Sequence, residues 1–118
     1  MNERPLNIGL TAWSDAGCLE TIQCTTNGSP TDFSGYTGLE LVAAESVYAA
    51  APAFTGVVTA PAPGTLQVEI PEATLKALFP EGSQPSYRQY VYALRAKPTG
   101  TYRVRLMYGT ISVNRGLP

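Results

Sequence analysis

Apolar and polar residues alternate along much of this chain, most clearly in its last third. Two long alternating runs, Tyr87–Ala96 and Tyr102–Asn114, flank the turn-forming residues 97–101. Because successive side chains of a β-strand point to opposite faces of a sheet, this pattern predicts a β-hairpin. Tyr90 and Tyr92 share the face of the first run that we expect to point into the core.

Shorter alternating runs precede this hairpin, and turn residues such as Asn27-Gly28 separate them. In the second strand of the hairpin the apolar phase restarts after Gly109, which we expect to mark a bulge or a bend. The strands expected before the hairpin are Leu6–Trp13, Cys18–Thr25, Thr37–Tyr48, Phe54–Ala60 and Thr65–Ile70.

One segment, residues 71–79, follows a helical period instead, with Leu75, Leu78 and Phe79 on one face. Pro71 suits the first helical turn, where its missing N–H needs no partner. About seven strands and this one short helix predict a single all-β domain over residues 1–118. The expected architecture is an immunoglobulin-like antiparallel β-sandwich, although the Cys-Trp-Cys order of antibody domains is absent.

The cysteines and the apolar content bear on the compartment. No stretch approaches the roughly 20 apolar residues of a membrane span, and the first residues lack the pattern of a secretory signal. We therefore expect synthesis in a cytoplasm and no membrane association. Cys18 and Cys24 would lie about 20 Å apart in one extended strand, whereas a disulfide needs Cα atoms within about 7 Å. They are expected to be small, reduced core residues.

Charge is unevenly distributed along the chain. Residues 1–75 hold one basic and eight acidic residues, whereas residues 76–118 hold seven basic residues and one acidic residue. Three interpretations remain open: cross-strand pairing inside the fold, complementary faces on different subunits, and a nucleic-acid patch. The acidic pI of 5.3 and the lack of a recognised binding module argue against nucleic acid as a partner.

Residues suited to catalysis are scarce. The chain has no histidine, so the usual general base and every Ser-His or Cys-His arrangement are missing. Two cysteines without histidine do not make a zinc site. Asp32 precedes Ser34 and Gly35 in a turn, where a carboxylate commonly accepts a hydrogen bond from its own backbone. We expect neither an enzyme nor a cofactor or metal.

The closing hairpin carries the candidate contact residues. Tyrosine-rich sheet faces bind sugars and proteins, because the ring is apolar and the hydroxyl is polar; the alternative is that the tyrosines pack in the core or in cross-strand pairs. The basic residues make the hairpin a candidate docking surface. The candidate protein-contact residues are Tyr87, Arg88, Arg95, Arg103, Arg105 and Tyr108.

The order of several short motifs resembles a phage protein family. Residues 30–37 (PTDFSGYT) precede a strand, residues 66–70 form an apolar strand that leads to the short helix, and residues 90–94 (YVYAL) precede the closing run 102–113 (YRVRLMYGTISV). This order resembles the N-terminal domain of phage baseplate upper proteins and related small tail proteins. The resemblance covers roughly residues 18–114, and its glycines, Gly35 and Gly109, are scaffold positions.

The resemblance implies an immunoglobulin-like virion component, synthesised in the cytoplasm of a bacterial host. Such a subunit would join other tail, baseplate or fibre proteins and would form a homo-oligomer in the particle. Family members usually continue into a helical linker and a domain that holds receptor-binding proteins, whereas this sequence stops at Pro118. A capsid decoration protein and a carbohydrate-binding module for the host surface remain alternatives.

Overall fold

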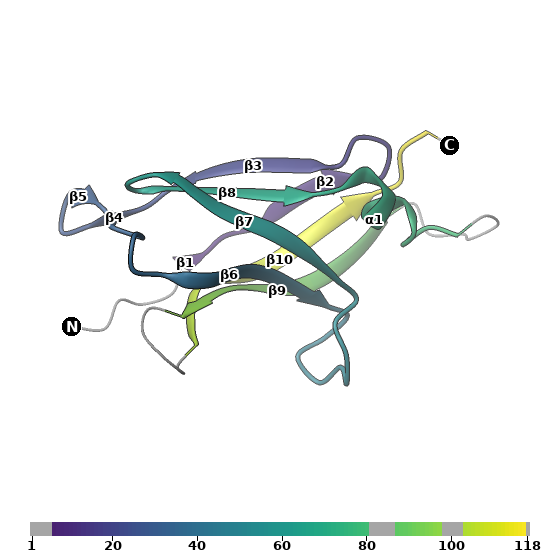
Figure 1. The fold of residues 1–118 in the computed structure, drawn as a ribbon. Coiled ribbons are helices and arrows are strands. Elements are labelled where there is room, and N and C mark those ends of the chain that lie inside the picture. Colours follow the sequence, from purple (N-terminus) through teal and green to yellow (C-terminus); the bar gives the residue numbers. More distant parts are fainter. Residues whose placement is uncertain (1–5, 81–86, 98–102, 118) are drawn as a thin grey trace.

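In a computed structural model, the described residues, 6–80, 87–97 and 103–117, form ten strands and one short helix (Figure 1). Residues 98–101 of the predicted turn and Tyr102 lie outside the described residues, whereas Lys97 belongs to the preceding strand and not to a turn. The elements are β1 (Leu6–Asn7), β2 (Leu10–Trp13), β3 (Cys18–Gln23), β4 (Thr25–Thr26), β5 (Ser29–Pro30), β6 (Thr37–Ala44), β7 (Phe54–Ala62), β8 (Thr65–Ile70), α1 (Glu72–Lys76), β9 (Tyr87–Lys97) and β10 (Val104–Asn114).

Eight of these strands form one sheet in the order β1-β10-β9-β6-β7-β8-β3, with β2 also paired to β10. Strands β1 and β2 run parallel to β10, and the other neighbours are antiparallel. A bridge between Trp13 and Gly17 links the end of β2 to the start of β3, so the sheet nearly closes into a barrel. The barrel is flattened, with β3, β8 and β7 facing β6, β9 and β10 (Figure 1).

The predicted all-β class with one short helix is therefore confirmed, and the closing hairpin is present as β9 and β10. The two separate sheets of an immunoglobulin-like sandwich are not confirmed, because the strands of both layers belong to one hydrogen-bonded sheet. The continuous pairing of β6 with both β9 and β7 joins the layers.

The core lies between the two layers and follows the predicted alternation. In β8, Leu66, Val68 and Ile70 are buried. Tyr90 and Tyr92 also point inward, as expected, and the Tyr90 ring meets the Phe54 ring edge-on, with 5.2 Å between the ring centroids. This edge-on geometry adds to the stabilisation that the Phe54 and Tyr90 rings contribute through their buried apolar area.

The predicted helix is shorter than its apolar pattern, because its last turn tightens. Leu78 and Phe79 donate backbone N–H groups to the carbonyls three residues earlier, both at 3.1 Å, as in a 3₁₀ turn. Leu75 is fully buried and Phe79 nearly so, whereas Leu78 is partly exposed. The segment covers the end of the barrel beside β2 and β10 (Figure 1).

Three strand predictions need correction. The run 6–13 is broken into β1 and β2 at Ile8-Gly9, the run 18–25 ends at Gln23, and the run 37–48 ends at Ala44, after which a loop begins. The phase of β10 changes at a bulge between Arg105 and Met107 rather than after Gly109. In the predicted Asn27-Gly28 turn both residues have positive φ, 53° and 83°, as a type I′ hairpin turn requires.

Candidate protein interaction surface

The strand register aligns outward-facing side chains into a row across six strands. Arg105 on β10 pairs with Arg95 on β9, which pairs with Glu40 on β6. The row continues from Glu40 through β7 and β8 to β3. Its members are Arg105, Arg95, Glu40, Val57, Glu69 and Leu19. Positive charge therefore gathers on one side of the barrel wall, and apolar side chains flank a carboxylate on the other.

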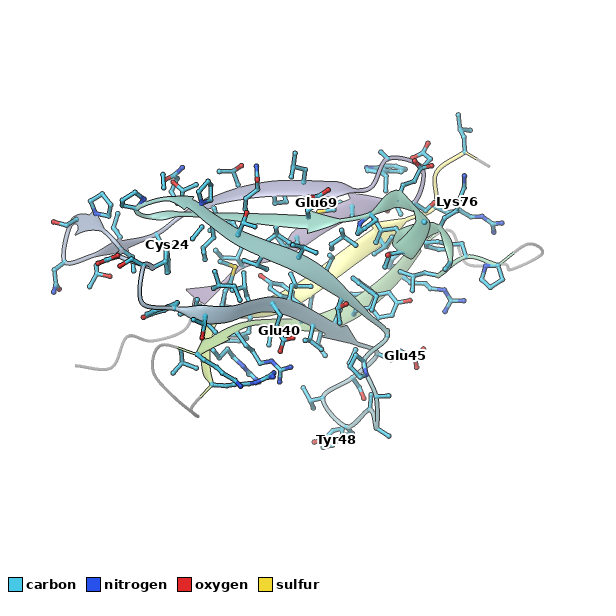
Figure 2. The ribbon with its side chains drawn as sticks, in the orientation of Figure 1. Cys24, Glu40, Glu45, Tyr48, Glu69 and Lys76 are labelled. Carbon is cyan, nitrogen blue, oxygen red and sulfur yellow. The ribbon has the colours of Figure 1, made fainter. Side chains whose placement is uncertain are left out.

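Glu40 pairs with two of the predicted contact residues. Its Oε1 accepts a hydrogen bond from Nη2 of Arg95 at 2.8 Å and another from Nη1 of Arg103. Figure 2 shows Glu40 on β6. Cross-strand pairing inside the fold is thus confirmed for this carboxylate. Partly exposed ion pairs contribute about 0–1 kcal/mol each, so the main effect is to neutralise one charge and to fix both guanidinium groups.

Arg105 differs from these two arginines. Its guanidinium carbon lies 5.9 Å from the centroid of the Tyr108 ring, a cation–π distance. Among the described residues no carboxylate lies within ion-pair distance of Arg105. Its positive charge is therefore available to a partner, and Tyr108, 37% exposed, orients it.

A groove of about 420 Å³ lies beside this pair, on the outer side of β6, β9 and β10. We call it the basic groove. Loop 45–53 forms its other side, and the backbone N–H of Ala53, bonded to the Ala43 carbonyl at 2.7 Å, anchors that loop. Small apolar side chains form the floor, and Arg95, Arg105 and Tyr108 line the groove with them. The floor residues are Val42, Ala44, Val91 and Ala93.

The tip of loop 45–53 carries two large apolar side chains in solvent. Val47 is 76% exposed and Tyr48 is 93% exposed. Figure 2 shows Tyr48 at the outer end of this loop, away from the barrel. Single exposed apolar residues are common on protein surfaces, but two neighbours beside an apolar groove are typical of a contact surface.

Two predicted contact residues lie away from the basic groove. Tyr87 is exposed at the start of β9, and Tyr108 pairs with Ala93, six residues further along that strand. At ~3.3 Å per residue the two tyrosines are about 20 Å apart. Arg88 is half-buried, with its guanidinium carbon 5.9 Å from the Phe79 ring centroid. The structure thus brings together Arg95, Arg103, Arg105 and Tyr108 and leaves out Tyr87 and Arg88.

A second surface lies on the outer side of β3, β8 and β7, and we call it the acidic patch. Leu19 and Val57, 66% and 59% exposed, flank the exposed Glu69. Trp13, 52% exposed, lies beside Gly17, two residues before Leu19. Figure 2 shows Glu69 on the layer of β8, opposite the layer that holds Glu40. The acidic patch consists of Trp13, Leu19, Val57 and Glu69.

The Asp32 carboxylate and the two thiols lie in environments that have a structural explanation. Asp32 Oδ1 accepts the Ser34 backbone N–H at 2.9 Å, as predicted, and this hydrogen bond lowers the pKa of the Asp32 carboxyl. Cys18 and Cys24 are free thiols, and burial raises the pKa of both. Within the described ranges no group of three or more His, Cys, Asp or Glu side chains could hold a metal ion. Nor does any described helix have the length and apolar character to cross a membrane.

Comparisons with protein-family models and with curated proteins found no match to this sequence.

Sequence patterns missed the floor of the basic groove. Val91 and Ala93 occupy the outward positions of β9, where a strand with one face in solvent would carry polar residues. Apolar residues on both faces of β9 were the available signal. The pairing of Glu40 with two arginines could not be inferred, because it depends on which strands become neighbours.

Proposed function

We propose that this chain is a structural virion protein of a bacteriophage, a tail, baseplate or fibre-attachment subunit that joins other virion parts by protein–protein contacts. One observation carries the proposal: an apolar groove with an unneutralised arginine lies beside a loop whose tip exposes Val47 and Tyr48. Tyrosine and arginine, together with tryptophan, are enriched among the energetically dominant contacts of protein interfaces.

The chemical character of the basic groove also favours a protein contact. A floor of valine and alanine offers little hydrogen bonding to a small polar ligand, whereas it can accept apolar side chains of a partner. Arg105 at the edge would add orientation and a faster encounter with an acidic partner.

The phage assignment is supported by the motif resemblance and by the structural roles of the residues that carry it. Asp32 closes a turn onto Ser34, and Phe33 between them is buried. Gly109 lies where a β-carbon would meet the Ile8 carbonyl oxygen at 2.3 Å. The two facing layers support the finer proposal of kinship with immunoglobulin-like sandwiches.

A carbohydrate-binding module is supported less well. Sugar binding on aromatic rings needs an open ring face, and neighbouring rings extend the platform. Arg105 lies over the Tyr108 ring, and Tyr87 is about 20 Å away along the strand. A capsid decoration protein would use the same kind of surface as a tail subunit, so only its location in the particle separates the two.

The location can be measured by quantitative mass spectrometry of purified particles of the phage that encodes the chain, after separation into heads and tails. We expect the chain in the tail fraction at a fixed ratio to a known tail protein. Its presence in heads alone would replace the proposal with a decoration protein. Its absence from particles, together with glycan binding that Tyr108→Ala abolishes, would replace it with a carbohydrate-binding module.

A further inference from the structure

We infer that the basic groove of one copy receives the acidic patch of a second copy, so that the protein associates head to tail. The inference rests on the proposed function as an assembly subunit and names one partner of its contact surface: the chain itself.

The two surfaces are complementary in charge. Arg105 at the basic groove and Glu69 in the acidic patch are exposed, and within the described residues neither has an ion-pair partner. Leu19 and Val57 stand on both sides of Glu69, on the neighbouring strands. Docking of these apolar side chains would remove water from the carboxylate between them. A desolvated carboxylate needs a cation, and Arg105 supplies one.

The two surfaces are also complementary in the size of their side chains. The acidic patch presents large exposed side chains, those of Trp13, Leu19 and Val57. The basic groove presents small ones, Val42, Ala44, Val91 and Ala93, over about 420 Å³. Large side chains of one copy can therefore enter the space above the small side chains of the next, which is how well-packed interface cores form.

The two surfaces are built from different residues, and Glu40 separates them, because it pairs with Val57 on one side and with Arg95 on the other. The acidic patch lies on β2, β3, β7 and β8, whereas the basic groove lies on β6, β9, β10 and loop 45–53. No residue belongs to both. A contact between two different surfaces of the same chain is heterologous, and it closes into a ring or continues as a filament. Either product is an expected form of a virion part.

Charge exchange tests the inference in the purified full chain. The variants Glu69→Arg and Arg105→Glu each place like charges across the contact, so each should associate at least about a hundredfold more weakly than the wild type, the usual scale for a disrupted interfacial charge pair. An equimolar mixture of the two variants restores opposite charges at every contact. The mixture, and the double variant Glu69→Arg/Arg105→Glu, should therefore associate again.

Sedimentation velocity over a concentration series measures these states, and circular dichroism verifies that each variant is folded. Lys76→Glu changes the net charge by the same amount as Arg105→Glu, at an exposed side chain on α1 that belongs to neither surface, and should associate like the wild type. If both single variants associate as the wild type does, or the mixture associates as weakly as its components, the proposed head-to-tail contact is wrong.

Binding to isolated tails separates this inference from the proposed function. A monomeric wild type whose binding to isolated tails is nevertheless lost in Arg105→Glu would overturn self-association alone. If Arg105→Glu also binds tails normally, the proposed contact surface fails with it.

Discussion

At the scale of single residues, Tyr92 connects parts of the chain that are far apart in sequence. Its hydroxyl donates a hydrogen bond to the Ile8 carbonyl oxygen at 2.6 Å, from β9 to the break between β1 and β2. Tyr92 is buried, and burial raises the pKa of its phenol to about 12. Because the folded state disfavours the Tyr92 phenolate, alkaline pH should lower the free energy of unfolding.

The pH dependence has a definite sign. An unfolded tyrosine ionises near pH 10, so the contribution of Tyr92 to stability is complete below pH 10 and is lost as pH rises toward about 12. A difference of about two pKa units corresponds to roughly 2–3 kcal/mol. We expect urea unfolding at pH 8 to 12 to show this loss in the wild type and a smaller loss in Tyr92→Phe. Part of the alkaline loss should remain, because burial also raises the pKa of Tyr90. Equal losses in both proteins would contradict the assignment.

At the scale of elements, β10 combines two features that the sequence suggested at one position. The bulge lies between Arg105 and Met107, and it returns Met107 to the core opposite Leu94. Gly109 has a different role: it lets the Ile8-Gly9 segment approach β10, where the Ile8 N–H bonds the Tyr108 carbonyl at 2.9 Å. Alternation alone shows that a phase change occurs, but it does not show which residue absorbs it.

The close approach predicts the effect of a methyl group. Gly109→Ala would place a β-carbon 2.3 Å from the Ile8 carbonyl oxygen, so the segment that carries β1 and β2 must shift. Overpacking of this kind costs about 1–3 kcal/mol, and we expect that loss in the free energy of unfolding measured with urea. Gly9→Ala is the matched control, because a β-carbon there has no neighbour within 4 Å. Equal stabilities of the two variants would mean that the contact between Ile8 and Gly109 is not close in solution.

At the scale of the whole molecule, local pattern predicted more of the strands than of their arrangement. Thr65–Ile70 and the two strands of the closing hairpin follow from alternation, and the helix follows from its apolar period. Near-closure of one sheet does not, because it depends on β1 and β2 joining β10, about 100 residues away in sequence. The candidate surface was predicted only in part, for the same reason. The sequence pattern identified its arginines, whereas Glu40 became their neighbour only through the pairing of β6 with β9.

The arrangement of the ion pairs also determines which variant is the better test of the contact surface. Arg103 holds Glu40, so Arg103→Glu would place two carboxylates together and destabilise the fold as well as any interface. Arg105→Glu removes the available charge without breaking an ion pair among the described residues. Tyr48→Ala removes an exposed anchor in the same way.

Binding of the purified chain to particles that lack it tests the central claim most directly. We expect the wild type and Lys76→Glu to bind such particles at the same fixed number of copies. Arg105→Glu and Tyr48→Ala should each bind at least about tenfold more weakly, as loss of a dominant interface contact would produce. Unchanged binding of both variants, with their folds verified by circular dichroism, would contradict the assignment of the basic groove and loop 45–53 as the contact surface.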